Sequence, residues 1–250
     1  MANTRLILLA GLIALPVLFP TPVLAASPPN ASLQASADTC FGKTPAGWTA
    51  MISACTQLLG AKMLPDQRAA TFYNRGAAYL QTGANDKALL DFNAALKIMP
   101  EFARALQGRG TILVAQKKYD AAVEDLSKVI KLDPKSTVSF NNRALAYLGL
   151  GQNKQAIDDL TQSIELDSKD ASAFATRGSA YIAIGDKEKA FDDLDTAIDM
   201  DPKLVIAHIN RGVLFAATGN KDKAKADFDA VLAVEPDNAA AKLQLASLAN

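Results

Sequence analysis

Five arginines recur along this 250-residue chain with a constant 34-residue spacing. They are Arg75, Arg109, Arg143, Arg177 and Arg211, and no insertion or deletion interrupts the period. A fixed period of this length is typical of repeat proteins, in which near-identical units stack and each buries its apolar face against its neighbours. The period excludes most enzyme architectures, because few of them consist of copies of one short unit.

A matching set of aspartates follows the arginines at a constant 16-residue offset: Asp91, Asp125, Asp159, Asp193 and Asp227. Counting Ala69 as position 1, the arginines occupy position 7 and the aspartates position 23 of each unit. Both positions face the contact between two helices, where an unpaired charge is costly. The sequence therefore predicts a structural ion pair in every unit. The alternative is a ladder of anion-binding arginines, which the matched acids would neutralise.

Five units account for most of the chain, at residues 69–102, 103–136, 137–170, 171–204 and 205–238. Each is expected to hold two helices. The first has non-polar residues at positions 4, 8 and 11, and the second has them at positions 20, 24 and 27. A glycine that suits a helix C-terminus separates them in four units, at Gly83, Gly151, Gly185 and Gly219, whereas the second unit has Lys117.

Both ends of the chain differ from the repeat. Residues 1–25 predict a cleaved secretory signal peptide, with a weakly basic start, an interrupted apolar run and small residues before the cleavage point. Residues 26–38 are small and polar and predict a disordered leader. Residues 39–68 predict an N-terminal capping helix, and the 34-residue register places Ala54, Leu58 and Ala61 on its repeat face. Residues 239–250 predict a C-terminal capping helix.

The chain has two cysteines, Cys40 and Cys55, and one histidine, His208. In an exported protein, two cysteines this close in sequence predict a disulfide bond, which would fasten the capping helix. A metal site would need more ligands than these residues provide. No metal and no cofactor are expected.

The pattern of non-polar positions with a terminal proline in each 34-residue unit resembles the tetratricopeptide repeat, over residues 69–238. Units that begin with an Asn-Arg-Gly box, as at Asn74-Arg75-Gly76, resemble those of exported bacterial members. The resemblance implies an all-α fold: a right-handed α-solenoid of five antiparallel helix pairs, capped at both ends, with a concave groove that binds partners.

The resemblance also implies that certain first-helix positions line this groove, and this gives the candidate partner-binding residues: Tyr73, Asn74, Leu80, Arg104, Gln107, Val114, Asn141, Asn142, Leu148, Ile182 and Asn210. Asparagine side chains both donate and accept, so they can bond an extended peptide backbone. The equally weighted alternative is that the asparagines bridge neighbouring units. The Lys-and-Asn set with which some members hold a terminal carboxylate is absent, so recognition of a C-terminal tail is not predicted.

These features predict a non-catalytic protein–protein interaction scaffold in a bacterial periplasm, which binds an extended peptide or partner protein in its groove. One alternative is a structural subunit of an envelope assembly that binds through its convex face or caps. An enzyme framed by the solenoid is disfavoured, because no phosphate loop, nucleophile–histidine pair or metal cluster is visible. The 26 basic and 26 acidic residues leave no net charge, which argues against nucleic acid as a partner. No membrane insertion is expected after signal cleavage.

Overall fold

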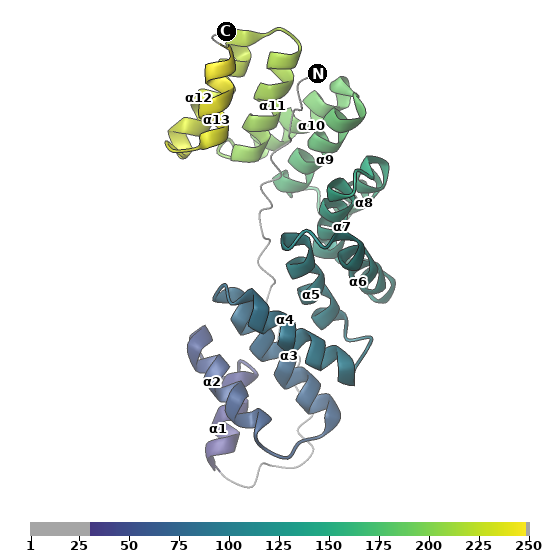
Figure 1. Ribbon diagram of the computed structural model, residues 1–250, viewed down its shortest axis with the longest axis vertical. Helices are drawn as coiled ribbons and strands as arrows, with labels where there is room; N and C mark the ends of the chain where they lie inside the picture. Colours follow the sequence, from purple (N-terminus) through teal and green to yellow (C-terminus); the bar gives the residue numbers. More distant parts are fainter. Residues whose placement is uncertain (1–30, 249–250) are drawn as a thin grey trace. The chain divides into compact units, whose positions relative to one another are not determined.

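The computed structural model describes residues 31–248, and over this range the chain forms α-helices joined by short loops (Figure 1). The predicted all-α class and the tandem arrangement of helix pairs are confirmed. The predicted signal peptide and the first residues of the predicted leader lie outside the described residues, as do residues 249–250.

The chain divides between Pro134 and Lys135 into two compact units. The described part of the N-terminal unit, residues 31–134, holds three helix pairs: α1 (Ala31–Cys40) with α2 (Trp48–Leu59), α3 (Pro65–Gln81) with α4 (Asn85–Ile98), and α5 (Ala103–Ala115) with α6 (Tyr119–Leu132). Short loops make the two helices of each pair antiparallel.

The C-terminal unit, residues 135–248 as described, also holds three helix pairs and then one single helix. The pairs are α7 (Thr137–Gly149) with α8 (Asn153–Leu166), α9 (Ala171–Ile184) with α10 (Lys187–Met200), and α11 (Val205–Ala217) with α12 (Lys221–Val234). The single helix α13 (Ala239–Leu248) packs on the last pair, where Ala241 is buried beside Phe228 and Val231. It therefore lies where the sequence predicts a C-terminal cap.

In four of the five units, the large residue at position 24 packs into the space left by a glycine at position 8 of the same unit. A methyl group added at Gly76 would lie 2.9 Å from the Phe92 ring, and one added at Gly212 would lie 2.7 Å from the Phe228 ring. Phe92 also reaches the next unit, where a methyl group at Gly108 would lie 2.6 Å from its Cζ atom. This ring therefore packs against the first helices of two successive units, and it is fully buried.

The turns after the first helices use the left-handed backbone region. Gly83 has a φ of 75°, and Lys117, at the same place in the second unit, has a φ of 60°. Residues other than glycine adopt this backbone conformation at a cost in free energy. The turn thus keeps one geometry in both units although the residue differs.

The N-terminal cap differs from the prediction, because it is a helix pair and not a single helix after a disordered leader. Helix α1 covers Ala31–Cys40, and its residues Ser36, Ala37 and Cys40 are buried. Ser36 donates to the side chain of Gln57 on α2 at 2.7 Å. The small polar composition of this segment suggested disorder, but packing against α2 stabilises a helix that would not form alone.

Helix α2 is also shifted by three positions from the predicted register. Its buried residues are Met51, Ala54, Cys55 and Leu58, which reproduce positions 20, 23, 24 and 27 of a full unit. Of the predicted set, Ala54 and Leu58 are buried on α2, whereas Ala61 lies beyond the end of this helix; α3 begins at Pro65, one helical turn before its first repeat position at Ala69.

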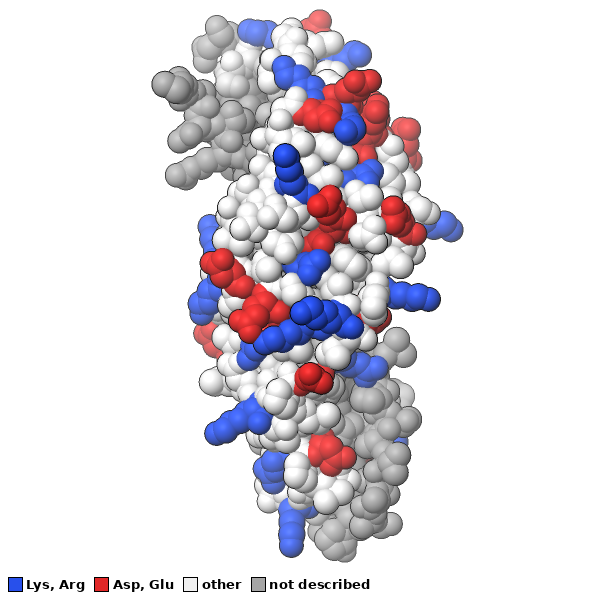
Figure 2. All heavy atoms as spheres, turned by 90° about the vertical axis from the view of Figure 1, so that its right-hand side faces the viewer, with Lys and Arg blue, Asp and Glu red and all other residues white. Residues whose placement is uncertain are grey.

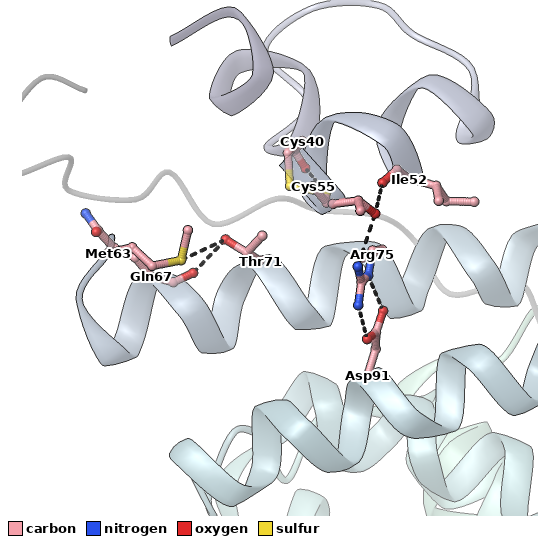
Figure 3. The surroundings of a disulfide bond; sticks show 9 residues. Cys40, Ile52, Cys55, Met63, Gln67, Thr71, Arg75 and Asp91 are labelled. Atoms are coloured by element: carbon pink, nitrogen blue, oxygen red, sulfur yellow. Dashed lines mark hydrogen bonds and ion pairs between the residues drawn. A yellow bond between two sulfur atoms is a disulfide. The ribbon is translucent and has the colours of Figure 1, made fainter. Parts of the chain in front are cut away.

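The disulfide joins Cys40 of α1 to Cys55 of α2, with the Cα atoms 4.9 Å apart (Figure 3). Their sequence separation of 15 is close to the 16-residue offset between Gly76 and Phe92. In the shifted register Cys55 corresponds to the large residue at position 24. The disulfide therefore cross-links the two helices of the first pair, with one cysteine at the position of the large residue.

Replacing both cysteines by serine is expected to destabilise the cap by about 3 kcal/mol, the chain-entropy value for a loop of this size. Helix α1 should lose most of its structure, since it contributes few other buried residues. The midpoint of urea unfolding, measured with and without reductant, checks this. Reductant should lower the midpoint of the native sequence and leave that of the double serine variant unchanged; equal midpoints for the two proteins under oxidising conditions would contradict the prediction.

Candidate functional site

All five arginine–aspartate pairs expected from the period are present and share one geometry. In each, the arginine Nε and Nη2 atoms donate to the two carboxylate oxygens of the matched aspartate, at 2.6–3.0 Å. The aspartate side chains are only 4–8% exposed. Two-point pairing of this kind is a strong and geometrically specific contact.

The remaining guanidinium nitrogen reaches the second helix of the preceding pair. The Nη1 atom donates to a polar side chain there, at 2.7–3.1 Å: Arg75 to Thr56, Arg109 to Asn93, Arg177 to Thr161 and Arg211 to Asp195. Figure 3 shows Arg75 between Asp91 and helix α2. Each of these arginines therefore ties three helices together, and a polar residue at position 25 of every unit is the sequence signal for it.

Aromatic rings cover several of the same guanidinium groups. Arg75 lies 5.8 Å from the centre of the Phe72 ring and 5.9 Å from that of Tyr79. Arg143 and Arg177 have equivalent neighbours at positions 4 and 11. Burial raises the pKa of Asp159, although Arg143 opposes the shift. The arginines are thus committed within the fold, and the alternative of an anion-binding ladder loses its support.

The candidate partner-binding residues divide into two groups by exposure. Five are half-buried on the first helices: Leu80, Arg104, Gln107, Leu148 and Ile182. Six are buried: Tyr73, Asn74, Val114, Asn141, Asn142 and Asn210. The apolar residues of the first group lie partly open, as a binding surface requires, whereas the amides of the second group need a separate explanation.

Two of the buried asparagines bridge successive helix pairs. The Nδ2 atom of Asn210 donates to the Ser179 hydroxyl, which lies at position 9 of the preceding first helix. The Nδ2 atom of Asn141 donates to Asp170 at 2.8 Å, and Asp170 in turn caps the start of α9. For these two residues the structure therefore shows the bridging role that the sequence left open.

Asn74 differs from both, because neither of its side-chain atoms has a hydrogen-bond partner although the residue is fully buried. It stands at the same repeat position as Asn210. The first helix of the preceding pair is α1, which does not follow the 34-residue period. The hydroxyl bridge that satisfies Asn210 has no counterpart at Asn74.

Arg104 brings a second unpartnered group to the same surface. It lies on α5, next to α3, and its Nη1 atom is buried without a hydrogen-bond acceptor. Burial raises the pKa of Tyr73, the neighbour of Asn74 in sequence, and the charge of Arg104 opposes that shift, which places the guanidinium close to Tyr73. Tyr73 and Asn74 of α3 and Arg104 of α5 lie on adjoining first helices, and the three residues are called the α3–α5 site below.

Two other kinds of site are absent from residues 31–248. Within that range no group of three or more His, Cys, Asp or Glu side chains is arranged to hold a metal ion. None of the described helices combines the length and the apolar composition needed to cross a membrane.

Three family models match the sequence. One, described as TPR repeat, covers residues 110–151. The other two are described as tetratricopeptide repeat and cover residues 69–102, and residues 141–205 with 209–250. The matches reach into all five units of the 34-residue period. No curated protein sequence matches the chain.

Solved structures share the fold. MamA from Desulfovibrio magneticus is 23% identical with a TM-score of 0.61, over 70% of this chain and 99% of that one. YrrB, described as a TPR protein with an unusual peptide-binding site, is 22% identical with a TM-score of 0.60, over 77% and 97%. A tetratricopeptide repeat protein from Parabacteroides merdae is 21% identical with a TM-score of 0.61, over 88% and 83%.

Proposed function

Because this chain belongs to the tetratricopeptide repeat family, we propose that it is a non-catalytic scaffold that binds an extended segment of a partner protein. The α3–α5 site is the proposed centre of binding. The fold supports an interaction role, and the peptide-binding site named for YrrB makes peptide binding the reasonable form of it to test.

One observation carries the proposal: the buried amide of Asn74 has neither a donor nor an acceptor partner. A buried amide left unpaired costs about 1–3 kcal/mol. The peptide group of an extended segment offers one N–H and one C=O, so it can pair with both atoms of the asparagine side chain at once. Because Asn74 has no exposed surface in the unbound protein, the segment must displace neighbouring side chains to reach it, and pairing then removes this cost.

Arg104 adds a preference for a negative charge. Its buried Nη1 atom is a charged donor without an acceptor, and a carboxylate is the side-chain group that best satisfies a guanidinium. The half-buried Leu80 lies on α3 as well, and provides an apolar contact. The expected ligand is therefore an extended segment that carries an acidic residue.

The proposed location is the periplasm, reached through the signal peptide expected at residues 1–25. The disulfide between Cys40 and Cys55 supports an oxidising compartment. On the face shown in Figure 2, basic and acidic side chains are interspersed without a broad area of one sign. A surface of that kind supports a protein partner over nucleic acid.

Affinity purification of the tagged protein from an envelope extract, followed by mass spectrometry, tests the proposal. The variant Asn74→Ala with Arg104→Ala is expected to lose the specific partner, with at least a tenfold drop in recovery, because each change removes a hydrogen bond worth about 1–3 kcal/mol. Circular dichroism shows whether the variant retains its helices.

A matched variant on the second helix of the same pair distinguishes the alternative, a subunit that binds through its outer face. Leu90 is 70% exposed on α4 and Lys97 is exposed on the same helix. Leu90→Ala with Lys97→Ala should leave partner recovery unchanged. Loss of the partner in this variant, together with retention in the Asn74 and Arg104 variant, would favour the structural-subunit function and reject the α3–α5 site.

A further inference from the structure

His208 lies at position 4 of the fifth unit, where three other units have phenylalanine. It is buried on α11, and both of its ring nitrogens meet oxygen atoms. Nδ1 lies 2.9 Å from Oδ1 of Asp227 on α12, and Nε2 lies 3.0 Å from the carbonyl oxygen of Pro202 in the loop before α11. The imidazole ring therefore connects the last helix pair to the loop that leads into it.

Both oxygens are hydrogen-bond acceptors. The Pro202 carbonyl can only accept, and Asp227 is ionised, because its hydrogen bonds with His208 and Arg211 outweigh the effect of burial and lower its pKa. A neutral imidazole carries a single N–H and can satisfy one of them. Only the imidazolium form donates to both, so the observed geometry fits the protonated ring.

The other charged groups around the ring are few. Arg211, on the same helix, donates to Asp227 at 2.7 and 3.0 Å and to Asp195 of α10 at 2.7 Å. Helix α9 meets α11 through the uncharged pair of Ser179 and Asn210. Helix α13 packs against the last helix pair through apolar residues. Asp227 is thus the charged group that bonds the ring directly, and Arg211 opposes protonation from further away.

We propose that His208 makes the pairing of α11 with α12 dependent on pH, so that the fifth unit is held closed in acid and loosens as the imidazolium loses its proton. After that loss, one ring nitrogen presents a lone pair to an oxygen about 3 Å away. The contact with Asp227 or with the Pro202 carbonyl is then repulsive, and a buried acceptor is left without a donor.

The direction of the effect follows from the protonation states. The hydrogen bond with Asp227 raises the pKa of His208 above its ordinary value of 6.5, against the opposing effect of burial. A group whose pKa is raised in the folded state stabilises that state fully below the unfolded pKa. This stabilisation is lost as the pH rises through the folded pKa. The fifth unit should therefore be most stable below about pH 6.5.

The single histidine makes the test direct, because its ring protons give one set of NMR signals that needs no assignment. The purified protein, prepared without a polyhistidine tag, is titrated from pH 5 to pH 9. The ring is expected to titrate above pH 6.5. For each pH unit by which the folded ring titrates above the unfolded one, the folding equilibrium constant should fall up to tenfold between the acid and alkaline limits. A ring that titrates at or below 6.5 would overturn the proposal.

The variant His208→Phe is the matched control, because phenylalanine occupies this position at Phe72, Phe140 and Phe174. Asp227 keeps both bonds from Arg211 in this variant. Its urea midpoint is expected to change less between pH 5.5 and pH 8.5 than that of the native protein. An equal change in the two proteins would show that other groups cause the pH dependence. His208→Gln, which stays neutral, gives the same comparison if the phenylalanine variant does not fold.

Discussion

Replacing Arg177 by alanine is expected to destabilise the protein by about 3–5 kcal/mol, because it leaves the carboxylate of Asp193 buried without its partner. The arginine donates to Asp193 at 2.8 and 2.9 Å and to Thr161 of α8 at 3.1 Å. Its removal therefore also breaks a contact with the preceding helix pair. Urea unfolding followed by circular dichroism measures the loss.

Two further variants separate the pair from a general effect of losing a positive charge. Arg177→Met combined with Asp193→Leu should recover most of the stability, because it removes both charges together and fills the space with apolar atoms. Lys225→Ala removes an exposed cation that bonds Asp229 at 2.6 Å in the fifth unit. Surface pairs contribute little, so its midpoint should hardly change. Equal effects of Arg177→Ala and Lys225→Ala would contradict the structural role of the arginine.

Replacing Phe92 by alanine is expected to cost about 3–5 kcal/mol, the range for a large buried aromatic side chain. The ring is fully buried and packs against Gly76 of α3 and Gly108 of α5. The cavity would therefore open between two successive units as well as within one. The urea midpoint is the measurement, and the unfolding of the N-terminal unit should be affected most.

The other units supply a natural control for this variant, because position 24 is leucine at Leu126, Leu160 and Leu194. Phe92→Leu should cost less than half as much as Phe92→Ala, since it leaves a smaller cavity. Leu90→Ala, on the exposed side of the same helix, should have little effect. The packing account would be wrong if Phe92→Ala and Leu90→Ala lowered the midpoint equally.

The ion pairs could be predicted from the sequence because the same contact recurs five times. A charge that returns in every unit beside a matched acid leaves few other structural interpretations. The third bond of Arg109, Arg177 and Arg211 was within reach of the same reasoning, since position 25 of the preceding unit is polar in each case. It was missed because that position lies in the preceding helix pair, and spacing inside one unit does not reveal it.

The candidate binding residues were harder to predict, because one residue type has different surroundings at one repeat position. Asn210 donates to Ser179 and is satisfied within the fold. Asn74 has no such partner. The difference depends on the register of α1 against α3, and α1 carries no trace of the 34-residue period from which that register could be read.

The sequence alone determined the repeat, the arginine–aspartate partners and the places of the turns, because each depends on a local environment that recurs along the chain. Only the tertiary structure decided the helical conformation of residues 31–40, the register shift of α2 and the surroundings of Asn74 and His208. Those features occur once. A feature that occurs once cannot be recognised from periodicity in the sequence. Its conformation depends on packing, on the disulfide and on which polar groups are available as hydrogen-bond partners.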